Sequence, residues 1–353
     1  MGVSMYNSNQ SLYDFGYTFL GPLLGTFIQR FDMEYPDSTP VCLAREGWAL
    51  ERILKRVQHE KLIKNLNNPI YFRVSRSLLY RFFMGDHKYW SYLLMKNFKG
   101  TVLQFLMNRI GMTRGEAEAE IDREFLTRMI DLPEDSGFLK ERFLEYRVFF
   151  KNYANPTQKA FTDYVQTLQL CNQSQDFTFL DVGYSGTIQI LLTSILQRNT
   201  EGYYFVTCVP EQNKVDRFNA SIRGAFFQNI KWNQGNFLLD RSLFLESILT
   251  APHGQIRDIR KRADDSFEFF YGREALPQIH SQDLATIING AEDCVVDSIR
   301  NKIFYSDSEI SGIYKAFVAP LSAIPKDISH LFSLDDDFSG NGLLHPAQLF
   351  GLQ

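Results

Sequence analysis

At 353 residues the chain exceeds the usual size of one hydrophobic core, so it is long enough for one large elaborated domain or for two units. Apolar residues make up 44% and charged residues 22% of the composition, which is typical of a soluble globular protein. The formal net charge of −4 argues against a general nucleic-acid-binding protein, because such a protein usually carries a basic face.

The N-terminal part of the chain predicts a buried helix. The chain as a whole predicts a cytoplasmic location. Residues 1–13 are polar and rich in Asn and Ser, and we expect them to be a frayed start or the remnant of a linker. Residues 15–31 are apolar but are interrupted by Gly21-Pro22 and Gly25, so they predict a core or interface helix and no transmembrane segment. The chain shows no basic-then-apolar signal and no Cys-x-x-Cys pair, which favours a reducing cytoplasm, with the protein free or peripheral to the inner membrane.

Two strand–loop–helix junctions follow in the first hundred residues. Residues 41–44 predict a short buried strand, which ends in Arg45-Glu46-Gly47, and apolar residues at helical spacing begin at Trp48. Residues 69–74 predict another strand, which leads through Ser75-Arg76-Ser77 into a helix that begins at Leu78. Charged residues therefore stand at the mouths of both loops.

Residues 85–165 read as helical throughout, with breaks at Gly111, Pro133 and Asn155-Pro156. We interpret this segment as an α-helical insertion. Further strands are predicted at 177–181, 203–209 and 225–227, an edge hairpin at 264–270, and one long helix at 281–318, and the residues after it as a loosely packed tail.

Strands separated by helical crossovers predict an α/β protein with a mostly parallel sheet. We assign residues 14–84 and 166–270 to the α/β core, 85–165 to the insertion and 271–353 to a helical and loop extension. The loops after the 41–44 and 177–181 strands would face one crevice, because open parallel sheets bind ligands at the carboxyl ends of their strands.

The loop after residues 177–181 carries the most informative motif, Asp181-Val182-Gly183-Tyr184-Ser185-Gly186-Thr187. No Lys follows Gly186 as in a nucleoside-triphosphate P-loop, and no Gly stands two residues after Ser185 as in a hydrolase nucleophile elbow. The dinucleotide Gly-x-Gly-x-x-Gly pattern is also missing. A Gly-containing loop before a helix is a natural seat for a phosphate, and an acid at the strand end can accept hydrogen bonds from sugar hydroxyls. The alternative is a plain turn in which Thr187 or Ser185 caps the helix.

Taken together, three spaced motifs resemble a family of bacterial capsule and O-antigen gene clusters. The motifs are Leu43-Ala44-Arg45-Glu46-Gly47, Arg73-Val74-Ser75-Arg76 and Leu180 to Thr187, and the resemblance covers about residues 14–255. Members of this family resemble phosphoribosyltransferases that act as glycosyltransferases, and they often share a polypeptide with a haloacid-dehalogenase-like phosphatase. The resemblance implies a phosphoribosyltransferase (Rossmann-like) fold. It also implies transfer of 5-phosphoribofuranose from phosphoribosyl pyrophosphate (PRPP) to a glycan.

The resemblance also implies a role for each motif. Asp181 would contact the ribose hydroxyls, and residues 183–187 would hold the 5-phosphate. Arg45, Glu46 and Gly47 would form the pyrophosphate loop, with Arg73, Ser75 and Arg76 adding polar and cationic contacts. The usual signature of such enzymes has two adjacent acids at the strand end, whereas here Leu180 precedes Asp181.

The chemistry of this transfer sets the remaining candidates. Cleavage of C1 from pyrophosphate needs cations and dipoles around the diphosphate, and Mg²⁺ would be bound together with PRPP. An acceptor hydroxyl needs a base, for which Asp181, Glu46 and Glu246 qualify by residue type. His253 lies in a turn and is a further candidate for ligand contact. No His, Cys and Asp cluster has metal-ligand spacing, so we expect no structural zinc.

The sequence therefore favours a PRPP-dependent glycosyltransferase that acts on a polysaccharide or lipid-linked oligosaccharide and works with a phosphatase that removes the 5-phosphate. Two other functions stay open. One is a nucleobase phosphoribosyltransferase, and the other is a non-catalytic module that binds a phosphate ligand or a partner enzyme.

Overall fold

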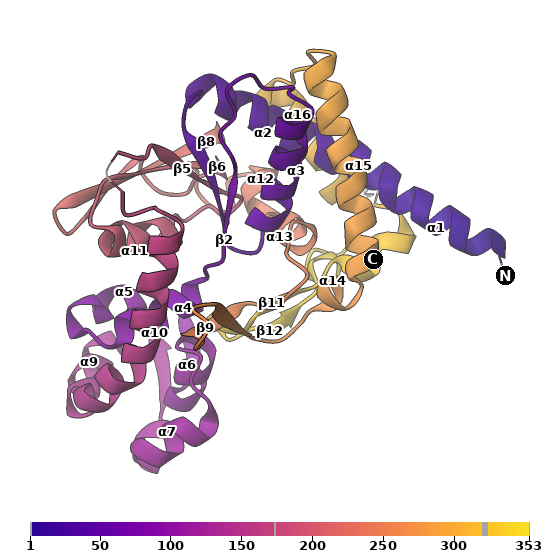
Figure 1. Ribbon diagram of the computed structural model, residues 1–353. Coiled ribbons are helices and arrows are strands. Elements are labelled where there is room, and N and C mark those ends of the chain that lie inside the picture. Colours follow the sequence, from indigo (N-terminus) through magenta and orange to yellow (C-terminus); the bar gives the residue numbers. More distant parts are fainter. Residues whose placement is uncertain (1, 173, 320–323, 353) are drawn as a thin grey trace.

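The computed structural model describes residues 2–172, 174–319 and 324–352 and shows an α/β protein built around one six-stranded sheet (Figure 1). The strand order is β2-β1-β5-β6-β8-β7. All neighbours are parallel except β7 and β8, which confirms the predicted mostly parallel sheet. The strands are β1 (Thr39–Leu43), β2 (Ile70–Phe72), β5 (Phe177–Asp181), β6 (Thr200–Val206), β7 (Gln212–Val215) and β8 (Phe218–Phe227).

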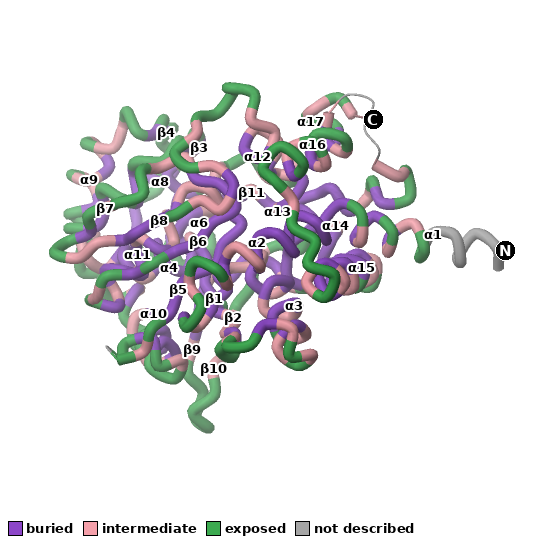
Figure 2. Tube along the Cα trace, turned by 90° about the horizontal axis from the view of Figure 1, so that it is seen from above, coloured by how far each residue is buried: buried purple, intermediate pink, exposed green. Residues whose placement is uncertain are grey.

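Both faces of the sheet are covered by helices, which explains why its strands are apolar runs and not alternating patterns. Val41 and Phe179 of neighbouring strands belong to one core, and Cys42 and Leu180, which point the other way, belong to a second core. The first core is formed with α4 (Arg76–Met84), α10 (Arg147–Thr167) and α11 (Thr187–Leu196). The second is formed with α2 (Gly21–Glu34), α3 (Gly47–His59) and α15 (Ser281–Arg300). Figure 2 shows these buried segments inside an exposed periphery.

The N-terminal segment for which a frayed start was predicted is helical over the residues that the structure describes. Residues 2–34 form α1 (Gly2–Phe15), a π-helical segment (Gly16–Leu20) and α2 without a break. Leu12 and Phe15 are each only 2% exposed, because α1 packs against α15. None of the helices in the part of the chain that the structure describes has both the length and the apolar character needed to cross a bilayer.

The segment predicted as one long helix at 281–318 is two helices, α15 and α16 (Asp307–Val318). A second helix begins there because Ser306 forms a capping box with Glu309, in which each side chain binds the other residue's backbone N–H. The apolar spacing continues across this break, and periodicity alone does not reveal it.

The insertion is mostly helical, but it also contains an antiparallel pair of strands, so the prediction of helix throughout was wrong. The pair is β3 (Phe98–Thr101) and β4 (Met129–Leu132). The expected break at Pro156 is also wrong, because α10 continues through it. Pro156 is exposed, so water can satisfy the carbonyl that loses its helical partner. The other insertion helices are α5 (Trp90–Leu94), α6 (Val102–Arg109), α7 (Arg114–Glu120), α8 (Arg123–Thr127) and α9 (Ser136–Glu145).

The residues after the main sheet pack tightly against both cores, and the expectation of a loosely packed tail was wrong. Phe332 and Phe338 are each 2% exposed, and Asp337 forms ion pairs with Arg257 (3.0 Å) and Arg273 (2.6 Å). The predicted hairpin near 264–270 is present as β9 and β10, but it forms a sheet of its own. These elements are α12 (Phe237–Asp240), α13 (Leu243–Ile248), β9 (Ile256–Lys261), β10 (Phe267–Tyr271), α14 (Leu276–Ile279), β11 (Leu334–Asp336), β12 (Gly342–Leu344) and α17 (Pro346–Leu349).

Candidate functional site

The loops after β1 and β5 meet, as expected, and line one cavity of about 700 Å³, including its solvent-open part. β1 and β5 are neighbours in the sheet, but the chain runs from β1 to the other side before it returns to β5. This is the point at which the strand order reverses, where α/β sheets commonly bind ligands. The cavity is lined by Ala44, Arg45, Glu46, Val74, Ser75, Arg76, Asp181, Gly183, Tyr184, Ser185, Gly186, Thr187, Ile188, Glu246 and Gln255.

The loop after β1 turns sharply into α3. Ala44 has a positive φ of 58°, which is uncommon for a residue with a side chain. Gly47 does not line the cavity, contrary to its predicted role in substrate binding. A Cβ atom on Gly47 would lie 2.5 Å from the Cys42 carbonyl carbon and oxygen, so glycine lets α3 approach the strand closely. Gly47 therefore sets the position of Arg45 and Glu46.

Replacing Gly47 by Ala is expected to destabilise the protein by about 2–3 kcal/mol, because the new methyl group meets backbone atoms that cannot rotate away. Urea unfolding would measure this loss. Gly115→Ala is the matched control, since Gly115 lies inside α7 with no atom within 4 Å of its Cβ position, and we expect it to stabilise the protein slightly. Equal stability of the two variants would contradict this role of Gly47.

The loop after β5 presents backbone donors to the cavity. Gly183 N donates to Asp181 Oδ1 (2.9 Å), which tightens the turn, and Gly186 adopts the left-handed conformation (φ 60°) just before α11. The helix has no side-chain cap, so the alternative in which Ser185 or Thr187 caps it is wrong. Their hydroxyl groups instead bond to each other (3.0 Å) at the cavity wall. The N–H groups of the first turn of α11 are therefore left for a ligand.

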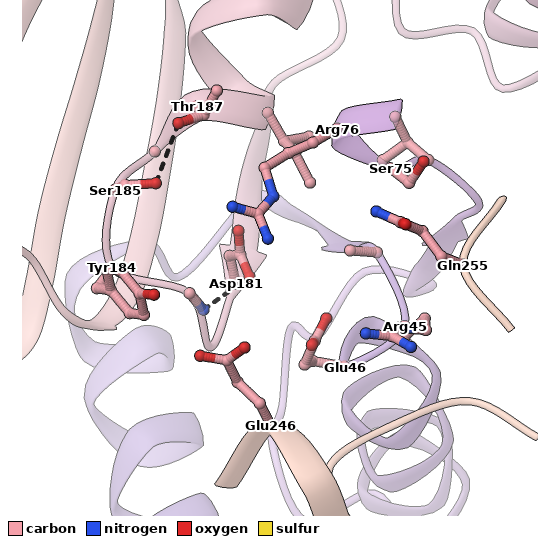
Figure 3. Close-up of a pocket in the computed structure, with 15 residues that line it drawn as sticks. Arg45, Glu46, Ser75, Arg76, Asp181, Tyr184, Ser185, Thr187, Glu246 and Gln255 are labelled. Carbon is pink, nitrogen blue, oxygen red and sulfur yellow. Dashed lines mark hydrogen bonds between the residues drawn. The ribbon is translucent and has the colours of Figure 1, made fainter. Parts of the chain in front are cut away.

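Three carboxylates from three different elements gather in the cavity. Figure 3 shows the side chains of Glu46 and Glu246 below Asp181, both extending upward into the cavity. Burial raises the pKa of Glu46 to about 7, where the charge of Arg45 opposes the shift and that of Asp181 adds to it. Burial also raises the pKa of Glu246 to about 7, and the charge of Glu46 adds to this shift. Burial also raises the pKa of Asp181 to about 6, although the Gly183 N–H opposes the shift. Such a group of acids titrates close to neutral pH, as candidate general bases should.

We expect the stability of the ligand-free protein to fall as the pH rises from about 5.5 to 8. The three carboxyl groups have pKa values in the folded protein that are raised above those of the unfolded chain. Their contribution to stability is therefore fully present below about pH 4, falls progressively as the pH rises, and is lost once the pH has passed through the folded pKa values of about 6 and 7. Glu46→Gln should therefore raise the free energy of unfolding at pH 8 by about 1 kcal/mol and flatten the pH profile. Urea unfolding at about pH 5.5 and at pH 8 tests this prediction. Glu141 is exposed, so Glu141→Gln serves as a control and should leave the free energy of unfolding unchanged at either pH.

Two arginines face these acids without being paired. Among the residues that the structure describes, the guanidinium groups of Arg45 and Arg76 donate no hydrogen bond and form no ion pair within 4 Å. The buried Arg81 and Arg109 are different. Arg81 bonds to Thr157 Oγ1 (3.1 Å) and pairs with Asp258 (3.2 Å), and Arg109 donates to four backbone carbonyls. The two cavity arginines thus keep their donors for a ligand.

The structure separates the other predicted site residues into two groups. Ser75 and Glu246 line the cavity, although the Ser75 hydroxyl accepts from Leu78 N (3.0 Å) and caps α4. Arg73 and His253 do not line it, contrary to prediction. The Arg73 guanidinium lies 5.3 Å from the centre of the Phe269 ring, and His253 Nε2 lies 3.0 Å from the Tyr71 hydroxyl. Both residues follow strands or turns near the site, but their side chains point to the aromatic residues beside it.

Sequence reasoning missed Gln255. This residue is 8% exposed, its amide lines the cavity, and no side-chain hydrogen bond to it is present among the described residues. Its only signal was its place two residues after His253 in the same turn.

A candidate metal cluster lies away from the cavity, although the sequence showed none. His280, Asp283 and His330 bring their ligand atoms within 4.8 Å of one another, and His330 Nε2 lies 2.9 Å from Asp283 Oδ2. His330 is remote in sequence, so spacing could not reveal it. In the cavity itself the three carboxylates are oxygen donors of the kind that Mg²⁺ prefers, and they fit a metal bound with a phosphorylated ligand.

No protein-family model and no curated protein matches the sequence of this chain.

Proposed function

We propose that this cavity binds PRPP and transfers its 5-phosphoribofuranosyl group to a hydroxyl of a polysaccharide or lipid-linked glycan, with release of pyrophosphate. The proposal includes a phosphoribosyltransferase type of α/β core. One observation carries it: two unpaired guanidinium groups, a loop of free N–H groups and three acids share one cavity at the switch point of the sheet. A ligand with phosphates at two places and hydroxyls between them fits this arrangement, because the guanidinium and N–H groups can bind the phosphates and the acids can bind the hydroxyls.

The two arginines suit the diphosphate end of the donor. Arg45 follows β1 and Arg76 begins α4, and both line the cavity. As the bond between C1 and the diphosphate oxygen breaks, negative charge grows on the leaving group. Fixed guanidinium forks stabilise that charge without any reorganisation at the moment of reaction. Mg²⁺ held with the diphosphate by Glu46, Asp181 or Glu246 would supply further neutralisation of the same charge.

The loop after β5 suits the sugar and its 5-phosphate. Asp181 can accept hydrogen bonds from vicinal hydroxyls, and the N-terminus of α11 favours an anion through its free N–H groups and its dipole. A carboxylate with a pKa of about 6 to 7 is half ionised near neutral pH, so Glu46, Glu246 or Asp181 can take the proton of the attacking hydroxyl.

The product of this transfer keeps the 5-phosphate, so a phosphatase must act after it to give an unmodified ribofuranose. We therefore propose a phosphatase partner, separate or on the same polypeptide, and a site of action in the cytoplasm or at its face of the inner membrane.

Thermal shift with PRPP and Mg²⁺, compared with sugar nucleotides, is the first test. At a PRPP concentration of one hundred times Kd we expect stabilisation by about 2.7 kcal/mol, and little with sugar nucleotides. Arg45→Met should lose most of this stabilisation and keep the melting temperature of the ligand-free protein. Stabilisation by a sugar nucleotide alone would contradict the proposal.

Pyrophosphate release then separates the three functions. Release that depends on a glycan acceptor supports the proposed transferase. Release that depends on a purine or pyrimidine base would indicate nucleobase salvage, and PRPP binding without release under either condition would indicate a non-catalytic module.

A further inference from the structure

A second cavity opens on the other side of the loop after β5. It measures about 1240 Å³ including its solvent-open part, and it shares Arg76, Tyr184 and Ser185 with the first cavity. Its remaining walls come from Arg109 and from three segments that are distant in sequence, at 95–99, 131–134 and 338–341. The two cavities are therefore neighbours with a common wall of three residues.

The buried Arg109 fixes two of these walls. Its side chain is fully buried, and it donates to Phe338 O (3.0 Å), Lys96 O (3.0 Å) and Asn97 O (2.5 Å). One guanidinium thus ties the insertion to the 338–341 segment. Because these bonds lie within the chain itself, they hold the walls of the second cavity in place, as is usual for the binding site of a small molecule.

The ring of Phe338, which lines the second cavity, contacts Arg76, which lines both cavities. The guanidinium of Arg76 lies 4.4 Å and that of Arg109 4.8 Å from the centre of the Phe338 ring, so one ring is in contact with both cations. The residue before Phe338 is also held in place, because Asp337 forms ion pairs with Arg257 and Arg273. Arg76 therefore has a fixed place on the boundary between the cavities.

The second cavity has a cation without a partner. Among the described residues, Lys96 Nζ forms no hydrogen bond and no ion pair, although Lys96 lines the cavity. Lys96 is an exposed residue, and partial burial of its ammonium group, together with the charges of Arg76 and Arg109, lowers the pKa of Lys96 against an opposing effect of Cys208. The acidic residues around the second cavity do not neutralise the charge of Lys96. Asp131 pairs with Lys99 (3.2 Å), Asp336 accepts from Ser339 and Asn341, and Glu134 is exposed at the rim.

We propose that the second cavity is the acceptor subsite and that Lys96 holds an anionic group of the acceptor sugar, either a phosphate or a carboxylate. This inference rests on the proposed transferase function. The acceptor hydroxyl reaches the donor past Arg76, Tyr184 and Ser185. Its oxygen forms the new bond to C1 of the ribose, the electron pair of the breaking C1–O bond leaves with pyrophosphate, and the hydroxyl proton passes to a cavity carboxylate.

Direct binding of small sugars tests the subsite without any turnover. Glucose 1-phosphate, glucuronic acid and glucose serve as the probes, and ligand-observed NMR titration gives their affinities. We expect at least one of the two anionic sugars to bind and glucose to bind at least tenfold more weakly. Lys96→Met should weaken the anionic sugar about tenfold or more, the range for a lost charge-assisted hydrogen bond. Lys159→Met is the matched control, because Lys159 is an exposed lysine of the insertion outside both cavities and its loss changes the net charge equally.

Three outcomes would overturn the proposal: unchanged affinity in Lys96→Met, equal binding of glucose, or loss of binding in Arg45→Met but not in Lys96→Met, which would place the probe in the first cavity. The response of the melting temperature to PRPP and Mg²⁺ separates this failure from failure of the proposed function. Lys96→Met should keep the full PRPP shift, since Lys96 lines only the second cavity. A protein that PRPP does not stabilise, but that binds anionic sugars through Lys96, would refute the transferase and with it the role of the subsite as an acceptor site.

Discussion

Replacing Arg76 by Met is expected to reduce kcat/KM for pyrophosphate release by about 10³-fold, the largest effect of any single cationic change in this protein. The guanidinium of Arg76 is unpaired, lies on the boundary of both cavities and is held in place by the Phe338 ring. Its loss removes a fixed cation from the leaving group, and Met fills a similar volume without charge. Arg76→Lys should recover only part of the activity, because an ammonium group cannot form the bidentate contact.

Arg73→Met is the control for this experiment. Arg73 is an exposed arginine three residues earlier, and it lies over the Tyr71 and Phe269 rings outside the cavity. We expect its activity to stay within about threefold of the wild type, as for a surface substitution away from the site. A larger loss in Arg73→Met than in Arg76→Met, measured in the same assay, would show that the donor does not occupy the cavity as proposed.

Asp181→Asn is expected to lower turnover by about 10³-fold or more and, at pH 8, to stabilise the ligand-free protein by about 1 kcal/mol. Asp181 is 7% exposed, and burial raises the pKa of its carboxyl group to about 6, so its ionised form is destabilising above that pH. The amide keeps the shape of the side chain and loses the charge. An active-site acid commonly shows this combination of lost activity and gained stability.

Asp258→Asn is expected to have the opposite effect on stability. Asp258 is also buried, but it pairs with Arg81 (3.2 Å) and accepts from Thr157 Oγ1 (2.6 Å). Its neutralisation leaves a buried guanidinium without its counter-ion, so we expect a loss of about 3 kcal/mol. Urea unfolding of the two variants at pH 8 should therefore move in opposite directions. Destabilisation by Asp181→Asn as well would mean that Asp181 has a structural role and not a functional one.

The part of the site that the sequence predicted depends on short-range patterns. Residues 39–59 and 177–196 each contain a strand, a loop and a helix in this order. In both segments the strand is a short apolar run and the helix has apolar residues at helical spacing. The rule for parallel sheets then brings Arg45 and Asp181 to the same edge without any knowledge of the strand order.

The part that the sequence did not predict depends on contacts between distant segments. Glu246 was a candidate by residue type only, and its place beside Glu46 follows from the packing of α13 against the sheet. The strand β5 ends in a single acid, Asp181. In the folded protein Glu46 and Glu246 supply further carboxylates to the same cavity from other elements. The role of residues 338–341 was hidden because their loop-rich composition gives no periodic signal.

The Phe338 wall also has a consequence for biosynthesis. Every strand of the six-stranded sheet lies between residues 39 and 227, so a ribosome releases the whole sheet well before it reaches Phe338. The nascent protein can thus form its central scaffold while Arg76 still lacks the ring on which it rests. The lining of the first cavity ends at Gln255, whereas the second cavity is completed only when residues 338–341 are translated, so the second cavity is the last of the two to form.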